Sequence, residues 1–225
     1  MNKAKRQSLL AVLIVAVILL ADQVIKIWVK THMCLGESIH VTDWFYIQFI
    51  ENNGMAWGMT FFNKYVLSIF RILAVTFLVW YLHRLIGKKN PSDLYVALLA
   101  MVMAGAAGNI IDSLFYGLVF SQSYVDCVAS VVPFGTGYGG FLTGRVVDMF
   151  YFPIIVSQWP DWMPVVGGDN FTFFNAIFNL ADAAITVSVF ALIIFCRKEL
   201  AATGDDLEFV FSRKKSNKEE NQQRK

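Results

Sequence analysis

Residues 8–29 read SLLAVLIVAVILLADQVIKIWV, a run in which Asp22 and Lys26 are the only charged residues. A run of about 20 mostly apolar residues is long enough to cross a bilayer as a helix. Of the 225 residues, 56% are hydrophobic and 16% are charged, whereas soluble domains have about 45–50% apolar and about 25% charged residues. No small-residue cleavage site follows the apolar run, so we expect it to be retained rather than removed as a signal peptide. The sequence predicts an integral membrane protein.

Three further segments have the length and hydropathy of membrane spans, which predicts four spans in all: 8–29, 65–86, 94–118 and 174–196. Lys and Arg gather at the N-terminus, in the connection at 87–93 and after Cys196, whereas the long 119–173 connection has only Arg145. Because basic residues mark cytoplasmic loops, both termini are expected in the cytoplasm and residues 119–173 outside.

The regions between the spans differ in composition. Residues 36–62 are rich in β-branched and aromatic residues and contain a turn signal, Asn52–Asn53–Gly54, which predicts strands near the membrane surface. Residues 119–143 are Gly-rich and irregular. Residues 197–225 are polar and charged, which predicts a disordered cytoplasmic tail beyond a single membrane domain of residues 1–196.

Three carboxylates fall at one depth in the predicted spans. Asp22, Asp112 and Asp182 lie six to eight residues from the outer ends of their helices, or roughly 9–12 Å below the outer surface. A carboxylate at the centre of a spanning helix costs roughly 2.5–3.5 kcal/mol on insertion scales, so these groups are expected to face the bundle interior. Asp22 and Lys26 are four residues apart and can form an ion pair. Asn109 shares a helix face with Asp112, and Asn179 shares one with Asp182.

These polar groups allow several interpretations. The Asp22–Lys26 pair can be purely structural, and Asn109 and Asp112 can be packing contacts. Buried carboxylates can also form a proton or ion pathway in a small transporter, or belong to a non-catalytic membrane assembly factor. Alternatively, two carboxylates can cleave a peptide, one as general base and one as general acid. Isolated His and scattered Cys residues give no metal site or disulfide framework, and we expect no cofactor and no nucleic-acid partner.

Five blocks in order resemble a known family. DQVIK (22–26), NNGMAWG (52–58), GAAGNIID (105–112), GRVVDMF (144–150) and FNLADAAI (178–185) are similar to motifs of the bacterial lipoprotein signal peptidases, or signal peptidase II. The resemblance implies an all-α membrane protein with four transmembrane helices, a small extracytoplasmic β-cradle at about 36–62 and, in this chain, an enlarged second outer loop at about 119–173. It also implies that the protein lies in the inner membrane with its active site near the outer face.

The resemblance assigns Asp148 and Asp182 as the catalytic dyad of an aspartic endopeptidase. It implies supporting or substrate-binding roles for nine residues: Asp22, Lys26, Asn52, Gly54, Gly108, Asn109, Asp112, Arg145 and Asn179. The implied substrate is a diacylglyceryl-prolipoprotein, cleaved before its lipidated cysteine by an enzyme in contact with membrane lipid and blocked by globomycin; we expect a monomer. The family usually has Arg where this chain has Ser113, and Arg145 is the candidate replacement.

Overall fold

The computed structural model describes residues 1–52, 64–88 and 91–202. In these ranges, three helical segments are long and apolar enough to cross a membrane. They are α1 (Lys3–His32), α2 (Lys64–Lys88) and the segment Asp93–Val119. The last comprises α3 (Asp93–Ile111), a π-helical turn (Asp112–Tyr116) and α4 (Gly117–Val119). The first three predicted spans are therefore confirmed as apolar helices.

The fourth predicted span, 174–196, is helical over only part of its length. Helix α5 (Leu180–Phe195) has 16 residues, so it is about 24 Å long, whereas the hydrocarbon core is about 30 Å thick. Its start is set by Asn179, whose side chain accepts a hydrogen bond from the backbone N–H of Asp182 and caps the helix. The total of four spans therefore stays a prediction.

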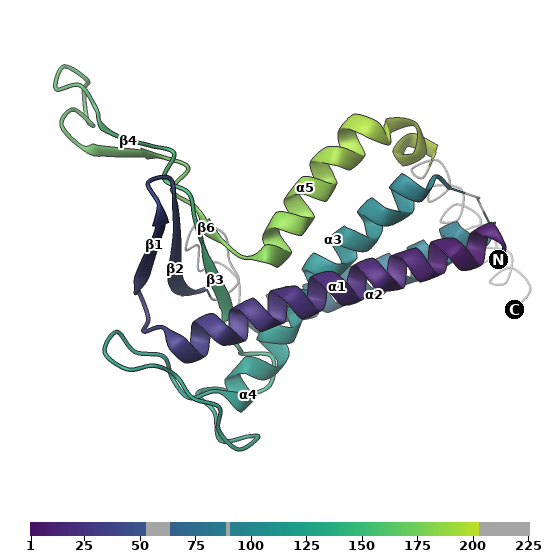
Figure 1. Ribbon diagram of the computed structural model, residues 1–225, viewed down its shortest axis with the longest axis horizontal. Coiled ribbons are helices and arrows are strands. Elements are labelled where there is room, and N and C mark those ends of the chain that lie inside the picture. Colours follow the sequence, from purple (N-terminus) through teal and green to yellow (C-terminus); the bar gives the residue numbers. More distant parts are fainter. Residues whose placement is uncertain (53–63, 89–90, 203–225) are drawn as a thin grey trace, which may run out of the picture.

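An antiparallel sheet lies at the ends of the helices opposite the N-terminus (Figure 1). Its four strands have the order β1 (Ser38–Thr42), β2 (Phe45–Asn52), β3 (Val146–Tyr151) and β6 (Ile177–Phe178). Strands β1 and β2 confirm the strand prediction over the described part of 36–62, while Asn53 and Gly54 of the predicted turn lie outside the described residues. The all-α expectation is too narrow, because β3 and β6 add strands from two later parts of the chain.

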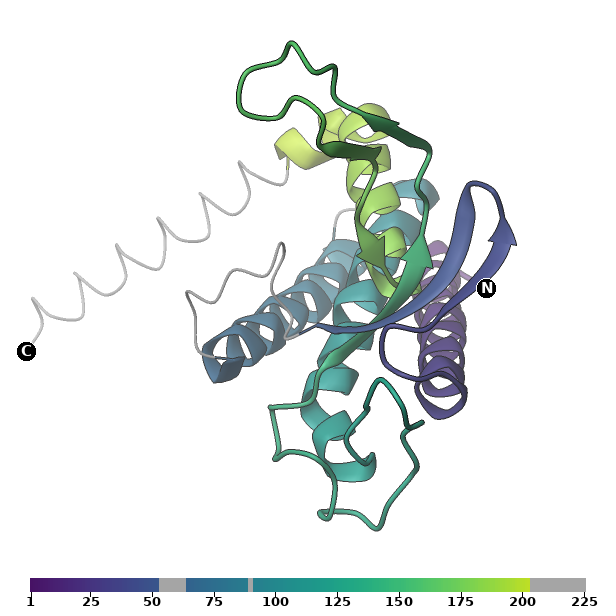
Figure 2. The ribbon, with the colours of Figure 1, turned by 90° about the vertical axis from the view of Figure 1, so that its left-hand side faces the viewer.

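The enlarged outer loop has two parts, one on each side of this sheet in Figure 2. Residues 120–145 form an irregular segment held by its own backbone hydrogen bonds, as between Ser121 and Ser130. After β3, strands β4 (Ile155–Gln158) and β5 (Asn170–Phe173) form a separate antiparallel hairpin. The prediction of an irregular Gly-rich segment is confirmed, whereas the hairpin was not predicted.

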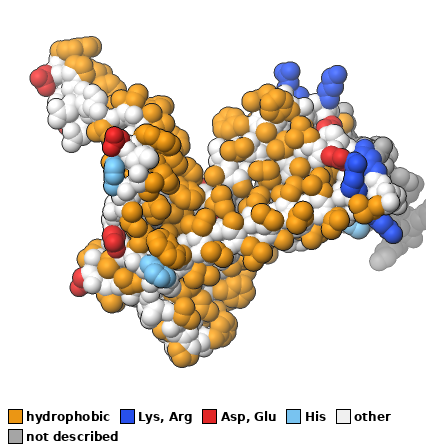
Figure 3. All heavy atoms as spheres, viewed as in Figure 1, with side chains coloured by type: hydrophobic (Ala, Val, Ile, Leu, Met, Phe, Trp, Pro, Cys, Tyr) orange, Lys and Arg blue, Asp and Glu red, His pale blue; other side chains and the backbone are white. Residues whose placement is uncertain are grey.

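Helix α3 packs against α1, α2 and α5 and is the centre of the helical layer. Two apolar clusters fill the interior. One includes Ala11 and Leu192 in the half near the N-terminus, and the other includes Val29 and Val147 where the helices meet the sheet. Figure 3 shows apolar side chains along the helices and Lys and Arg gathered at the end near the N-terminus. The buried polar groups described below lie between the two apolar clusters.

Only the first part of the predicted disordered tail, residues 197–202 of 197–225, lies within the described residues. Residues 197–202 are helical. The Glu199 carboxylate accepts hydrogen bonds from the backbone N–H and the hydroxyl of Ser92, at 2.9 Å each. These bonds hold the turn after α5 against the N-terminus of α3.

Candidate active site

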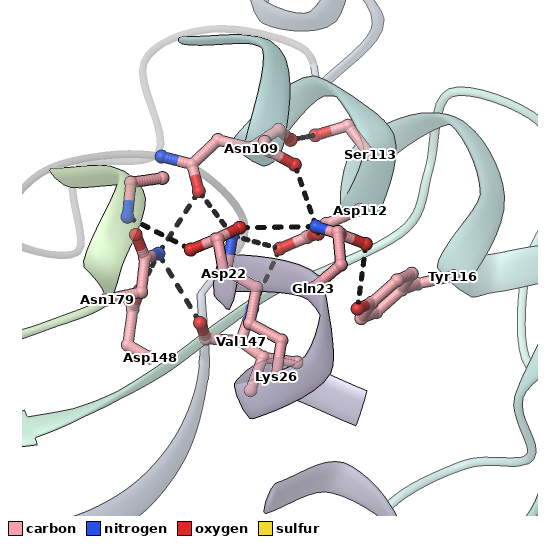
Figure 4. Close-up of polar contacts among 12 residues, drawn as sticks. Asp22, Gln23, Lys26, Asn109, Asp112, Ser113, Tyr116, Val147, Asp148 and Asn179 are labelled. Atoms are coloured by element: carbon pink, nitrogen blue, oxygen red, sulfur yellow. Dashed lines mark hydrogen bonds and ion pairs between the residues drawn. The ribbon is translucent and has the colours of Figure 1, made fainter. Parts of the chain in front are cut away.

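Lys26 is the centre of a buried cluster of charges (Figure 4). Its ammonium lies 2.8 Å from an oxygen of Asp22, 2.9 Å from one of Asp112 and 2.8 Å from the side-chain oxygen of Asn109. The three charged side chains are at most 1% exposed. The predicted Asp22–Lys26 ion pair is confirmed, and Asp112 from α3 joins it. A buried ammonium needs such partners because an isolated charge is very costly in an apolar interior.

Asp22 also fixes the position of α5. Its second oxygen accepts a hydrogen bond from the backbone N–H of Ala181, at 3.0 Å, in the first turn of that helix. Gly108 faces the same carboxylate: a Cβ atom at this position would lie 2.8 Å from the Asp22 oxygen that pairs with Lys26. The absence of a side chain at Gly108 therefore lets α1 and α3 approach closely here.

The charge on Lys26 determines how two asparagine amides are oriented. An ammonium can only donate hydrogen bonds, so the oxygen of Asn109 must face Lys26. The Asn109 nitrogen then donates to Asp182, at 2.7 Å. The Asn179 nitrogen donates to the oxygen of Asn109 at 3.1 Å and to Asp148 at 2.7 Å, while its oxygen accepts from the Asp182 N–H at 2.9 Å. Asn179 therefore contacts both aspartates that the sequence predicted to form a dyad.

Asp148 lies on β3 and is only 1% exposed, whereas Asp182 is half-buried. Burial, followed by the nearby charge of Asp182, raises the pKa of Asp148 from 3.8 to about 7. Hydrogen bonds from Asn52 (3.3 Å) and Asn179 oppose this rise in pKa, as does the charge of Lys26. A carboxyl group with a pKa near neutrality can hold or release a proton at physiological pH, as acid–base catalysis requires.

Sequence reasoning placed no cation beside Asp182, but the fold supplies one. Arg71 of α2 lies close enough to Asp182, Asp112 and Asp148 for electrostatic attraction. Arg71 and the three aspartates lie far apart in the sequence, so no local spacing of residues predicted that they would be close.

Gln23 and Tyr116 were also missed. The Gln23 amide donates to Asp112 at 2.9 Å and to the Gly108 carbonyl at 3.3 Å, and the Tyr116 hydroxyl donates to Gln23 at 3.2 Å. Gln23 stands next to Asp22 within the DQVIK block. Its position beside a buried carboxylate was the one available signal that it belongs to the same network.

Arg145, another predicted residue, does not join this cluster. The Arg145 guanidinium lies 2.9 Å from Glu51, so the expectation that it replaces the family's usual Arg beside Asp112 is wrong. The reason is that Arg145 precedes β3 and faces the end of β2. Gly54 lies outside the described residues. In the part of the chain that is described, no group of three His, Cys, Asp or Glu side chains could hold a metal ion.

Comparisons with known proteins identify the family. The family model for "Signal peptidase (SPase) II" matches residues 14–197. The chain belongs to the signal peptidase II family. The lipoprotein signal peptidase of Porphyromonas gingivalis is 44% identical over 194 residues, covering 86% of this chain and 85% of that one. The lipoprotein signal peptidase of Amoebophilus asiaticus is 34% identical, covering 79% and 72% of the two chains.

Solved structures support the fold. A structure described as "Bacterial membrane enzyme structure by the in meso method at 2.3 A resolution" has a TM-score of 0.57 and 24% identity, covering 85% of this chain and 90% of that one. A second, at 1.9 Å resolution, has a TM-score of 0.55 and 26% identity, covering 82% and 90%. Membership of the signal peptidase II family implies that this membrane protein is a peptidase. It also supports the removal of signal peptides from prolipoproteins.

Proposed function

We propose that this protein is an aspartic endopeptidase that cleaves diacylglyceryl-modified prolipoproteins just before the lipidated cysteine. Asp148 and Asp182 form its catalytic dyad. The observation that carries the proposal is the position of Asn179, which donates to the Asp148 carboxylate and accepts from the Asp182 backbone within a family known for signal-peptide removal. One asparagine therefore holds both aspartates in a fixed relation.

The dyad hydrolyses the peptide bond by acid–base chemistry. One carboxylate, ionised, takes a proton from water as the water oxygen bonds to the scissile carbonyl carbon. The other, protonated, donates a proton to the carbonyl oxygen. The resulting tetrahedral diol returns one hydroxyl proton to the dyad as the C–N bond breaks, and the amine leaves with the proton that the dyad took from water. The raised pKa of Asp148 fits this chemistry, because two neighbouring carboxylates do not readily ionise together.

The location of the dyad fits a substrate held in the bilayer. Asp148 lies on the sheet and Asp182 in the first turn of α5, where the sheet meets the helices. Asp182 is half-buried and can be approached, while Asp148 lies deeper. A prolipoprotein anchored by its diacylglyceryl group would reach this level by moving in the membrane plane, in contact with lipid. The distribution of Lys and Arg supports an inner-membrane protein with both termini cytoplasmic and the site near the outer face.

Cleavage by the purified protein tests the proposal. A prolipoprotein carrying diacylglycerol on its lipobox cysteine is incubated with the enzyme, and an otherwise identical unmodified precursor serves as the control. We expect cleavage before the cysteine of the modified precursor only, and its loss on addition of globomycin. Equal cleavage of both precursors would contradict the proposed substrate. No cleavage of either would contradict the proposed activity and favour a transport or assembly role.

A further inference from the structure

A second cluster of buried charges lies outside the network of the dyad. The Glu51 carboxylate on β2 is 2% exposed and pairs with Lys30 of α1, whose side chain is fully buried. The Arg145 guanidinium lies 2.9 Å from the Glu51 carboxylate, and the Ser123 hydroxyl donates a hydrogen bond to the same carboxylate at 2.8 Å. The Tyr138 ring covers both cations, with its centroid 4.9 Å from the Lys30 nitrogen and 5.2 Å from the Arg145 guanidinium carbon.

The enlarged outer loop provides most of this cluster. Ser123, Tyr138 and Arg145 all come from the segment 120–145, and the Tyr138 hydroxyl also accepts a hydrogen bond from the Arg145 backbone, at 2.6 Å. Burial raises the pKa of Glu51, but its cationic and hydroxyl partners outweigh burial and leave the pKa below its ordinary value. Glu51 is therefore ionised at neutral pH, and its charge ties β2 to the loop and to α1.

Glu51 immediately precedes a residue that contacts the dyad. In the β2–β3 pairing, Glu51 is opposite Val147, Asn52 opposite Val146 and Ile50 opposite Asp148. The Asn52 amide donates to Asp148 at 3.3 Å, and this hydrogen bond lowers the pKa of Asp148. Asn52 is also the last residue of β2, so the contacts of Glu51 fix the end of the strand from which the Asn52 amide extends.

We propose that Glu51 is a positioning residue: the loop 120–145 and Lys30 hold its carboxylate, and Glu51 in turn keeps the Asn52 amide on Asp148. This inference rests on the proposed function and gives the enlarged loop a role in it. The charged and titratable groups that act on Glu51 include Lys30 of α1, Lys64 of α2, and Tyr138 and Arg145 of the loop. Those that act on Asp148 include Asp182 of α5, Lys26 of α1 and Arg71 of α2.

The pH dependence of cleavage tests this role. If Glu51→Gln releases Asn52, the ionised form of Asp148 loses a donor and its pKa rises, so the limb of the kcat profile that reports Asp148 moves to higher pH. At pH values below the pKa, a rise of about half a pKa unit would lower the ionised fraction of Asp148 roughly threefold. We expect this shift with little change in KM. An unshifted profile for Glu51→Gln would overturn the inference.

A double variant shows whether Glu51 acts through Asn52. Asn52→Ala alone should move the limb that reports Asp148 in the same direction, and adding Glu51→Gln should move it no further. Two shifts that add would overturn the proposal, because Glu51 would then act by another route. Asp43→Asn is the matched control: its carboxylate is fully exposed in the β1–β2 turn, and we expect a wild-type profile.

A further variant separates an effect on folding from an effect on the pH profile. Glu51→Gln leaves the buried Lys30 ammonium without its main counter-charge, which can lower the yield. The variant Lys30→Met/Glu51→Gln removes both charges and should recover folded protein, yet retain the shifted pH limb of Asp148. If this variant had the pH profile of the wild-type protein, the proposed positioning role of Glu51 would be overturned. Absence of cleavage by the unaltered protein would contradict the proposed function itself, whereas normal cleavage with unshifted variants would contradict only this inference.

Discussion

Asp148 shows how a single residue can link activity to stability. Its pKa rises from 3.8 to about 7 on folding, so between these values the folded state holds a proton that the unfolded chain releases. Stability therefore falls as the pH rises through this window, and the full cost is present above pH 7. A rise of about three units corresponds to a cost on the order of 4 kcal/mol. The carboxyl group proposed for catalysis is one that weakens the fold at neutral pH.

Replacing Asp148 by Asn should remove this pH-dependent cost. We expect Asp148→Asn to raise the melting temperature, and to raise it more at pH 8 than at pH 5. The gain at pH 8 should exceed the gain at pH 5 by several degrees, since about 1 kcal/mol corresponds to roughly 2–4 °C in a protein of this size. Thermal unfolding in detergent at the two pH values measures this difference. The same difference at both pH values would show that Asp148 does not titrate in this window.

Lys26 should matter for folding at least as much as for turnover. Its ammonium is shared by Asp22, Asp112 and Asn109, so Lys26→Met leaves two buried carboxylates without their shared cation. Loss of one partner from a buried pair costs on the order of 3–5 kcal/mol. We expect a lower yield of folded protein in detergent, measured by size-exclusion chromatography. A full yield with abolished cleavage would instead assign Lys26 a direct role in catalysis.

Contacts within one helix were easier to predict than contacts between elements. Asp22 and Lys26 are four residues apart, so helix geometry alone predicted their pairing. Helix lengths also placed Asp22, Asp112 and Asp182 at one depth. By contrast, Arg71 reaches the aspartates from another helix, and Arg145 turns to Glu51 because of strand pairing. Neither contact has a local signal in the sequence.

At the level of elements, the spans were predicted better than the sheet. Apolar length is the dominant signal for a spanning helix, and it located the first three closely. Strand β3 was missed because residues 146–151 show no alternation of apolar and polar residues: Val147 and Met149 are buried on one face, and Asp148 on the other. A strand covered on both faces lacks the period-two pattern that identifies a half-exposed one.

Close packing of α3 on α5 depends on Gly105. A Cβ atom at Gly105 would lie 2.3 Å from the Ala181 carbonyl oxygen and 2.7 Å from a side-chain carbon of Ile185. Backbone cannot shift cheaply, so we expect Gly105→Ala to destabilise the protein by about 1–3 kcal/mol, measured by thermal unfolding. Gly87→Ala on α2 is the control, because no atom outside its chain neighbours and its own helix backbone lies within 4 Å of its Cβ position. Equal stability of the two variants would contradict this account of the α3–α5 contact.

At the scale of the whole molecule, charge and fold indicate one orientation. The sheet and the outer loop lie at one end of the helices, and the N-terminus and the basic side chains lie at the other (Figures 1 and 3). This separation of charge is what the positive-inside rule requires of a chain with a cytoplasmic N-terminus. In this proposed orientation, the proposed dyad lies toward the outer face.

Cys127 provides a test of this orientation, because it is exposed in the outer loop while Cys196 is buried. In a Cys34→Ser background, a membrane-impermeant maleimide added to spheroplasts should label Cys127 without permeabilising the inner membrane. Cys127→Ser in the same background is the control for labelling elsewhere. Labelling of Cys127 only after permeabilisation would place the loop in the cytoplasm and reverse the proposed topology.

The central claim is that Asp148 and Asp182 act as one unit in catalysis, and kcat for Asp148→Asn, Asp182→Asn and the double variant tests it most directly. Asn cannot accept a proton from water or donate one as an acid, and general acid–base steps contribute roughly 10²–10⁴-fold each. We predict that each single variant loses at least about 100-fold in kcat while still binding globomycin, and that the double variant is scarcely worse. Asp43→Asn should retain wild-type turnover. Retention of more than about a tenth of wild-type turnover by either single variant, well above the smallest expected loss, would contradict the assignment of the dyad.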